Sequence, residues 1–213
     1  MKSTIRYCED IGMFAYDRGI PQSCIHATNF CAVNCYNDKL YKIYPNMRGK
    51  DEKNEIFWAH IDGALVRADL SRRRKQTKRV RLMTRGEAFS TFSDIARVES
   101  ILIENPNTDW WIPTRAWRHP ILRFAVRKLA EKHNNARILA STDPTTTTEE
   151  WAQLKSDGWS TMFFGDDEQR VTPNGDKHFL CPKTHGHVKG ACEVCKKGCF
   201  RSDRRVDVHL SQH

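Results

Sequence analysis

From residue 79 onward, the apolar positions of the chain switch repeatedly between two spacings. Short runs rich in β-branched and aromatic residues predict buried strands at 79–87, 108–115, 136–144 and 159–167. Between these runs the apolar residues recur at helical spacing, which predicts amphipathic helices at 91–106, 119–135 and 145–158. Strands that alternate with helices of this length indicate a parallel sheet, because a parallel pair needs a crossover connection.

The chain upstream of residue 79 continues this alternation. The pattern predicts a long helix over residues 51–75 and a first strand near residues 19–25, in a sheet of about five strands. The expected fold class is therefore α/β, either a full or partial (β/α) barrel or an open, doubly wound parallel sheet. Residues 1–175 are assigned to this α/β domain and residues 176–213 to a small C-terminal cysteine-rich module.

Polar residues follow each of the predicted strands at the point where it ends. These strand ends are Gly86-Glu87, Thr114-Arg115, Ser141-Thr142-Asp143 and Gly165-Asp166. A single polar strand end is ordinary turn chemistry. In either architecture, however, a ligand site lies at the carboxyl ends of the strands. We therefore expect these residues to meet at one edge of the sheet, which we call the carboxyl edge.

Composition indicates a folded protein and limits the cellular locations that we expect for it. Hydrophobic residues make up 39% of the 213 positions. No apolar run approaches the roughly 18 residues of a membrane span, and the first residues lack the apolar core of a signal peptide. A cytoplasmic location without a membrane partner is the expectation. In such a reducing compartment, the eight cysteines are expected to be metal or cluster ligands rather than disulfides.

The net charge of +9 makes an anionic partner such as nucleic acid plausible. The one clear charge block spans residues 71–81 and contains no acid. It is interpreted either as a solvated helix end or loop, or as a patch that contacts phosphates. In the second case the candidate nucleic-acid-binding residues are Arg72, Arg73, Arg74, Lys75, Lys78 and Arg79.

Four cysteines cluster near the C-terminus. Ten, two and three residues separate them in order, and glycines between them allow tight turns. Soft thiolates at this density suit tetrahedral zinc or an iron–sulfur cluster. The predicted ligands are Cys181, Cys192, Cys195 and Cys199.

Three further cysteines, Cys24, Cys31 and Cys35, are separated by six and three residues. Three thiolates are one short of a closed four-ligand site. A cubane iron–sulfur cluster held by three thiolates keeps one iron open for a small molecule. The alternative is a structural site that is completed by His26, by Cys8 or by a cysteine of the C-terminal cluster.

A three-cysteine loop that ends in "CYN" and precedes repeated strand–helix units resembles the radical S-adenosylmethionine superfamily. More closely, the order of motifs resembles a family of bacteriophage proteins known as gene product 88. The matching positions are the three loop cysteines, "GEAFS" at 86–90, "PTRAW" at 113–117, "ASTDP" at 140–144 and the Cys181-Pro182 pair with the cysteines that follow.

The resemblance implies a four-iron, four-sulfur (4Fe-4S) cluster at the loop, a second cluster or zinc at the C-terminal cysteines, and possible binding of S-adenosylmethionine. The residues implied to bind this cofactor are Gly86, Glu87, Arg115, Ser141 and Asp143, whereas no catalytic residue is implied. It also implies the host cytoplasm as the location.

Three functions follow from these features. The first is a radical modification of an unknown substrate. The second is a non-catalytic, phage-type protein with a metal-stabilised fold that binds nucleic acid or a host protein through its basic face. The third is a metal-stabilised scaffold with a vestigial site. The sequence predicts neither the substrate nor the oligomeric state.

Overall fold

The computed structural model describes residues 5–73, 78–166, 172, 175, 177–186, 190–195, 199–200 and 207–211. Within these residues the strands form one eight-stranded sheet in the order β1-β2-β3-β4-β5-β6-β8-β7. The strands are β1 (Arg6–Cys8), β2 (Met13–Tyr16), β3 (Arg79–Leu82), β4 (Asp109–Thr114), β5 (Ala136–Thr142), β6 (Ser160–Gly165), β7 (Phe179–Leu180) and β8 (Val208–Ser211).

The helices between β3 and β6 follow the alternation predicted for the second half of the chain. The helices of the described chain are α1 (Asn29–Val33), α2 (Tyr36–Ile43), α3 (Pro45–Trp58), α4 (Gly63–Ser71), α5 (Phe92–Glu104), α6 (Pro120–Lys132), α7 (Thr148–Ser156), α8 (Pro182–His185) and α9 (Ala191–Val194). A short 3-10 helix, η1 (Ala116–Arg118), precedes α6. Capping boxes begin α5 at Thr91 and α7 at Thr147, as their sequences favour.

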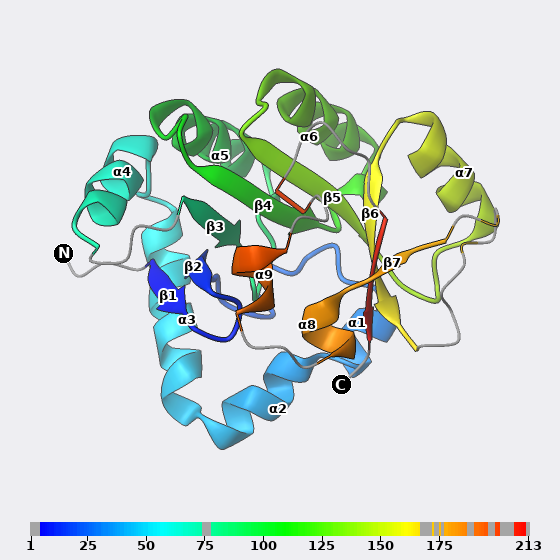
Figure 1. Ribbon diagram of the computed structural model, residues 1–213, viewed down its shortest axis with the longest axis horizontal. Coiled ribbons are helices and arrows are strands. Elements are labelled where there is room, and N and C mark those ends of the chain that lie inside the picture. Colours follow the sequence, from blue (N-terminus) through cyan, green and yellow to red (C-terminus); the bar gives the residue numbers. More distant parts are fainter. Residues whose placement is uncertain are drawn as a thin grey trace.

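The strand order explains which face the helices cover. Strands β2 to β6 are parallel and neighbour one another in chain order. Successive right-handed crossovers in one direction place every crossover helix on the same face. Figure 1 shows α4, α5, α6 and α7 along one side of the sheet, with α8 and α9 on the other. The mostly parallel α/β sheet is confirmed in its open form. The doubly wound alternative is wrong, because the order of these strands does not reverse.

Two of the sequence predictions upstream of β3 are wrong. The helix predicted over 51–75 is two helices, because the Asp62 side chain accepts a hydrogen bond from Leu65 N (2.8 Å) and starts α4. The first strand of the parallel series is β2, and no strand lies at 19–25. There, local bonds from Ser23 N to Gly19 O and from Cys24 N to Pro21 O fold the chain into turns. Strands β1, β7 and β8 were not predicted.

The two faces of the sheet carry different residues. Alternate side chains such as Phe14, Val80, Trp110 and Ile138 point toward the helices and form the main core. The opposite face, which we call the inner face, carries the cluster of Trp111, Leu139 and Met162. This alternation follows from the two-residue period of a strand.

The C-terminal part of the chain contributes to the same sheet. Strand β8 pairs in parallel with β6, and β7 pairs with β8. Cys192, Cys199 and Phe200 pack against the inner-face cluster. The boundary between residues 175 and 176 stays a prediction. Among the described helices, none is long and apolar enough to cross a membrane.

Candidate functional site

A cavity of about 170 Å³ lies at the carboxyl edge of the sheet. Its lining brings together residues from the loops after β2, β3, β4 and β5, which are far apart in sequence. The predicted site residues in this lining are Cys24, Cys31, Cys35, Gly86, Glu87, Arg115 and Ser141. The structure therefore places the cysteine loop (residues 23–35) beside the strand ends.

Two predicted members of this edge lie outside the cavity lining. Asp143 is fully buried behind Arg115 and contacts the site only through it and through Thr28. Asp166 is exposed, and its carbonyl oxygen lies 2.9 Å from His209 Nε2.

Thr28 fixes the short helix that carries Cys31. Its Oγ1 accepts a hydrogen bond from Cys31 N (3.0 Å) and donates to Asp143 Oδ2 (2.6 Å). The same carboxylate oxygen accepts from Arg115 Nη1 at 2.6 Å. Asp143 thereby joins the cysteine loop to the ends of β4 and β5.

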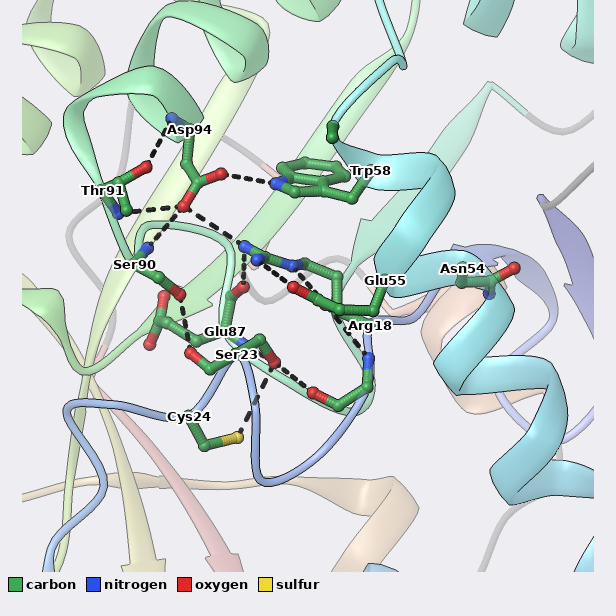
Figure 2. Close-up of polar contacts among 12 residues, drawn as sticks. Arg18, Ser23, Cys24, Asn54, Glu55, Trp58, Glu87, Ser90, Thr91 and Asp94 are labelled. Atoms are coloured by element: carbon green, nitrogen blue, oxygen red, sulfur yellow. Dashed lines mark hydrogen bonds and ion pairs between the residues drawn. The ribbon is translucent and has the colours of Figure 1, made fainter.

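Ser23 joins the start of the cysteine loop to the turn after β3. Its Oγ donates to Gly19 O (2.6 Å) and accepts from Glu87 N (3.1 Å), and its carbonyl accepts from Ser90 Oγ (2.6 Å). Figure 2 shows these contacts next to Cys24, whose sulfur lies 4.0 Å from Ser23 Oγ. The position of Cys24 is thus set by the backbone of the Gly86-Glu87 turn.

A buried arginine, Arg18, binds the backbone of this turn. Arg18 donates to Glu87 O (2.9 Å) and to both carboxylate oxygens of Glu55 (2.8 and 2.6 Å), and it lies 3.3 Å from Asp94 (Figure 2). Asp94 also accepts from Trp58 Nε1 at 2.6 Å. Each buried charge therefore has an opposite partner, as burial requires.

Gly86 occupies a position that other residues fit poorly. Its φ is +83°, and a Cβ atom there would lie 2.7 Å from Ser23 Oγ and 2.9 Å from Arg18 Cβ. The glycine lets the turn approach the cysteine loop closely.

The Glu87 carboxylate is held at the cavity wall by three donors. Oε1 accepts from Phe89 N (3.0 Å) and Thr114 Oγ1 (2.7 Å), and Oε2 accepts from Arg115 N (2.7 Å). The two oxygens of a carboxylate have about four acceptor sites. Glu87 is thus both fixed in orientation and able to accept from a cation in the cavity.

A second buried ion network underlies the turn and was missed by sequence reasoning. Arg85 forms a bidentate pair with Asp51 (2.6 and 3.0 Å) and lies 2.8 Å from Asp17. Asp17 also pairs with Arg6 at 3.0 Å. Asp51 and Asp17 are 34 and 68 positions from Arg85, so no local pattern signals the pairing.

The thiols of the cysteine loop are half-buried. Burial, followed by the nearby Glu87 carboxylate, raises the pKa of Cys24 to about 12. Burial also raises the pKa of Cys31, against the opposing charge of Arg115. These thiols are protonated unless a cation lies among them, since a cation favours the thiolate.

The alternative fourth ligands lie elsewhere. His26 is absent from the cavity lining, and its ring packs against that of His119 at 5.7 Å between centroids. Cys8 is also outside the lining. The four C-terminal cysteines line a separate cavity of about 20 Å³. The lining of the first cavity thus includes only three of the chain's eight cysteines.

In the described part of the chain, no group of three or more His, Cys, Asp and Glu side chains is placed so that it could hold a metal ion. The sulfurs of each cysteine set share a cavity without closing around a common point.

Among the described residues of the basic block, the predicted nucleic-acid-binding residues are absent from the cavity lining, although Arg81 at the end of the block belongs to it. The block connects α4 to the start of β3, at the opposite end of the strands from the carboxyl edge. Arg72 and Lys78 are exposed. Arg73 pairs with Asp69 at 3.1 Å, and Arg79 Nη1 donates to the carbonyls of the 192–195 turn. Arg74 and Lys75 fall outside the described residues.

A family model described as gene product 88 matches residues 11–205. Searches of curated proteins and of solved structures give no match. The family match spans both cysteine sets and every strand-end residue of the cavity.

Proposed function

Since the chain belongs to the gene product 88 family, we propose that it is an iron–sulfur protein in which Cys24, Cys31 and Cys35 hold a 4Fe-4S cluster. We further propose that the site resembles those of radical S-adenosylmethionine enzymes and modifies an unidentified substrate. One observation carries the proposal. Three half-buried thiols, a carboxylate and a guanidinium from three separate loops line one cavity at the carboxyl edge.

The donor set suits a cluster better than a single ion. A cubane cluster binds each cysteine through a different iron, so its ligands stand farther apart than those of one ion. The cavity of about 170 Å³ that these thiols share is larger than a single ion needs. Because His26 and Cys8 lie outside the lining, the fourth iron would stay open to a small molecule.

Glu87 and Arg115 supply opposite charges to the same cavity. Glu87 would accept from the ammonium of an amino acid end, and Arg115 would donate to its carboxylate. Asp143 accepts one N–H of Arg115, and a guanidinium carries five such donors. Ser141 and Gly86 line the remaining wall. A cluster held by Cys24, Cys31 and Cys35 and reduced by an external one-electron donor would supply the electron for reductive cleavage of S-adenosylmethionine.

Replacing one loop cysteine tests the cluster. We expect protein purified without oxygen to contain iron and labile sulfide at this site, and Cys35→Ala to lose the cluster and any reductive cleavage of S-adenosylmethionine. Electron paramagnetic resonance of the reduced protein, with and without S-adenosylmethionine, measures whether the open iron binds the cofactor.

Cys8→Ala is the matched control, because Cys8 is a thiol outside both cavities. Iron and sulfide that persist unchanged in Cys35→Ala would exclude the loop as the ligand set. If the resonance of the cluster does not change when S-adenosylmethionine is added, the iron–sulfur site would stand and the radical proposal would be wrong.

A binding function through the basic face is the second candidate. It rests on the net charge and on exposed Arg72 and Lys78. Arg73 and Arg79 contribute to internal contacts, which weakens the phosphate patch as a continuous surface. If this function holds, Arg72→Gln with Lys78→Gln should reduce nucleic-acid affinity and its salt dependence. In either case we place the protein in the host cytoplasm, where thiols stay reduced.

A further inference from the structure

The second cavity collects four cysteine side chains from three segments of the chain. Cys181 follows β7, Cys192 and Cys195 belong to the α9 turn, and Cys199 comes after it. The remaining wall is largely apolar and includes Trp111, Phe200 and Val208. Strand β8 lies between β6 and β7 in the sheet. Cys192 and Cys199 pack against the inner-face cluster, so the site lies on the inner face.

Backbone hydrogen bonds hold Cys181 in place. Its N–H donates to His209 O in β8 (3.0 Å), and its carbonyl accepts from the backbone N–H of Thr184 and of His185. Cys181 is therefore fixed between the sheet and the first turn of α8.

Arg79 of β3 fixes the turn that carries the middle pair of cysteines. Its Nη1 donates to Cys192 O (2.8 Å), to Glu193 O (2.9 Å) and, at 3.4 Å, to Cys195 O. The same guanidinium lies 5.2 Å from the centre of the Phe200 ring. One charged side chain thus organises the backbone of three positions between Cys192 and Cys195.

The β1–β2 turn supports the same segment from another side. Gly190 N donates to Asp10 O (3.0 Å), and Lys183 Nζ lies 2.9 Å from an Asp10 carboxylate oxygen. Gly12 has a φ of +70°, and a Cβ there would lie 2.9 Å from Glu193 Cβ. Arg79 and the β1–β2 turn therefore both contact the turn that carries Cys192 and Cys195.

The size of the cavity distinguishes the two metals that four thiolates suit. Its volume of about 20 Å³ is close to the roughly 10–15 Å³ that one water-sized probe requires. A cavity of this size is closer to what a single ion needs than to what an eight-atom cubane needs. Four thiolates around one ion form the closed tetrahedral arrangement that structural zinc adopts.

We propose that Cys181, Cys192, Cys195 and Cys199 bind one tetrahedral Zn²⁺ that holds the C-terminal segment against the inner face of the sheet. The thiols already face one cavity, so rotation about each Cα–Cβ bond and small shifts of the turn would close the coordination group. Binding releases the thiol protons to solvent and needs no redox partner.

This site is independent of the cluster proposed at the cysteine loop. Arg81 lines the first cavity and lies 4.3 Å from the centre of the Trp111 ring, which lines the second. The ion would therefore stabilise the wall that separates the two cavities.

Metal analysis of the full chain with the three loop cysteines replaced (Cys24→Ala, Cys31→Ala and Cys35→Ala) tests the zinc site alone. We expect one zinc per chain, no iron and no sulfide. Replacement of the zinc by Co²⁺ should give the absorption bands of a tetrahedral four-thiolate site. Cys199→Ser added to this variant should remove the four-thiolate spectrum, whereas Cys8→Ala should leave it unchanged.

Arg79→Gln provides a second measurement that keeps all four thiols. Loss of its carbonyl bonds should weaken zinc retention against a chelator by about 10–100-fold, the usual effect of changing an outer-shell partner. Lys78→Gln, at an exposed neighbour, is the control.

Iron with sulfide in the loop-cysteine variant would overturn the single-ion assignment, and a mononuclear iron site would overturn zinc. Absence of bound metal in the folded chain, with no Co²⁺ uptake, would overturn the site. If Cys199→Ser fails to fold, the Co²⁺ spectrum of the parent variant still decides the outcome. None of these results depends on whether the loop holds a cluster.

Discussion

At the scale of single residues, buried charge positions the backbone of the candidate site. Arg18 binds the carbonyl of Glu87, Arg85 binds Asp51 and Asp17, and the carboxylate of Glu87 accepts from the end of β4. Removing one member of a buried pair leaves the other charge uncompensated, which is costly. The turn after β3 is therefore held in one conformation before any ligand binds.

Gly86→Ala should destabilise the protein. The added Cβ meets Ser23 Oγ at 2.7 Å, and the residue has a φ of +83°. Strain of this kind costs about 1–3 kcal/mol, measured as the free energy of unfolding in urea. Gly49→Ala is the control, because its Cβ would meet open space within α3. It should stabilise the helix by up to about 1 kcal/mol. Equal effects at both sites would contradict the close approach.

Ionisation of Asp17 should make the free energy of unfolding depend on pH in the acid range. Burial opposes its ionisation, but Arg85, Arg6 and Thr84 outweigh it and lower its pKa. Its stabilisation is therefore complete above the unfolded-state pKa of about 4 and is lost as the pH falls through the lower folded-state value. Asp17→Asn should lower the free energy of unfolding by about 3 kcal/mol at neutral pH and flatten its acid slope.

Urea unfolding at several pH values measures this effect. Glu52→Gln, which changes an exposed carboxylate on α3, should retain the wild-type slope. If the free energy of unfolding of Asp17→Asn depends on acid pH as the wild type does, the ion pairs of Asp17 with Arg6 and Arg85 do not control acid stability.

At the scale of elements, α1 depends on contacts beyond itself. A helix of five residues cannot offset its own nucleation, so tertiary bonds must hold it. Thr28 supplies both its N-cap and its link to Asp143. Cys31 therefore takes its position from one hydroxyl group.

Thr28→Val should loosen α1, because valine has nearly the same shape as threonine but lacks the hydroxyl group. Loss of the cap is expected to cost about 1–2 kcal/mol, and faster amide exchange at residues 31–34 would report it. Thr28→Ser keeps the hydroxyl and should retain most of the protection. Fast exchange in both variants would indicate that packing of the methyl group, rather than the two hydrogen bonds, holds the helix.

At the scale of the whole molecule, the C-terminal segment completes the sheet. Val208 and His209 of β8 are buried and pair with Met162 and Phe163 of β6. The segment therefore shares its contacts with the strands of the α/β domain.

A chain that ends at residue 175 should fold poorly. Losing β8 exposes Met162 and Phe163, and each fully buried apolar side chain contributes about 1.5–3 kcal/mol. We expect a broadened, less cooperative urea transition and binding of a hydrophobic dye. A cooperative transition with wild-type stability would instead support residues 1–175 as an independent domain.

Much of the fold could be predicted because its signals are local. Period-two and helical spacing identified β3 to β6 and α5 to α7, and the capping residues Thr91 and Thr147 set two helix starts. The break between α3 and α4 depends on the Asp62 cap inside an otherwise helical pattern, and periodicity alone does not locate it. Strand β7 has two residues, which is too short to show a period.

The sequence by itself determined the alternation of strands and helices, the strand-end residues and the two sets of cysteines. These depend on spacing along the chain, which is a local property. Only the tertiary structure decided that the loop cysteines share a cavity with Glu87 and Arg115, that His26 lies outside it, and that Arg79 binds the second cysteine turn. Those facts depend on pairing and burial between distant segments, and the free energy of such contacts leaves no periodic trace in the sequence.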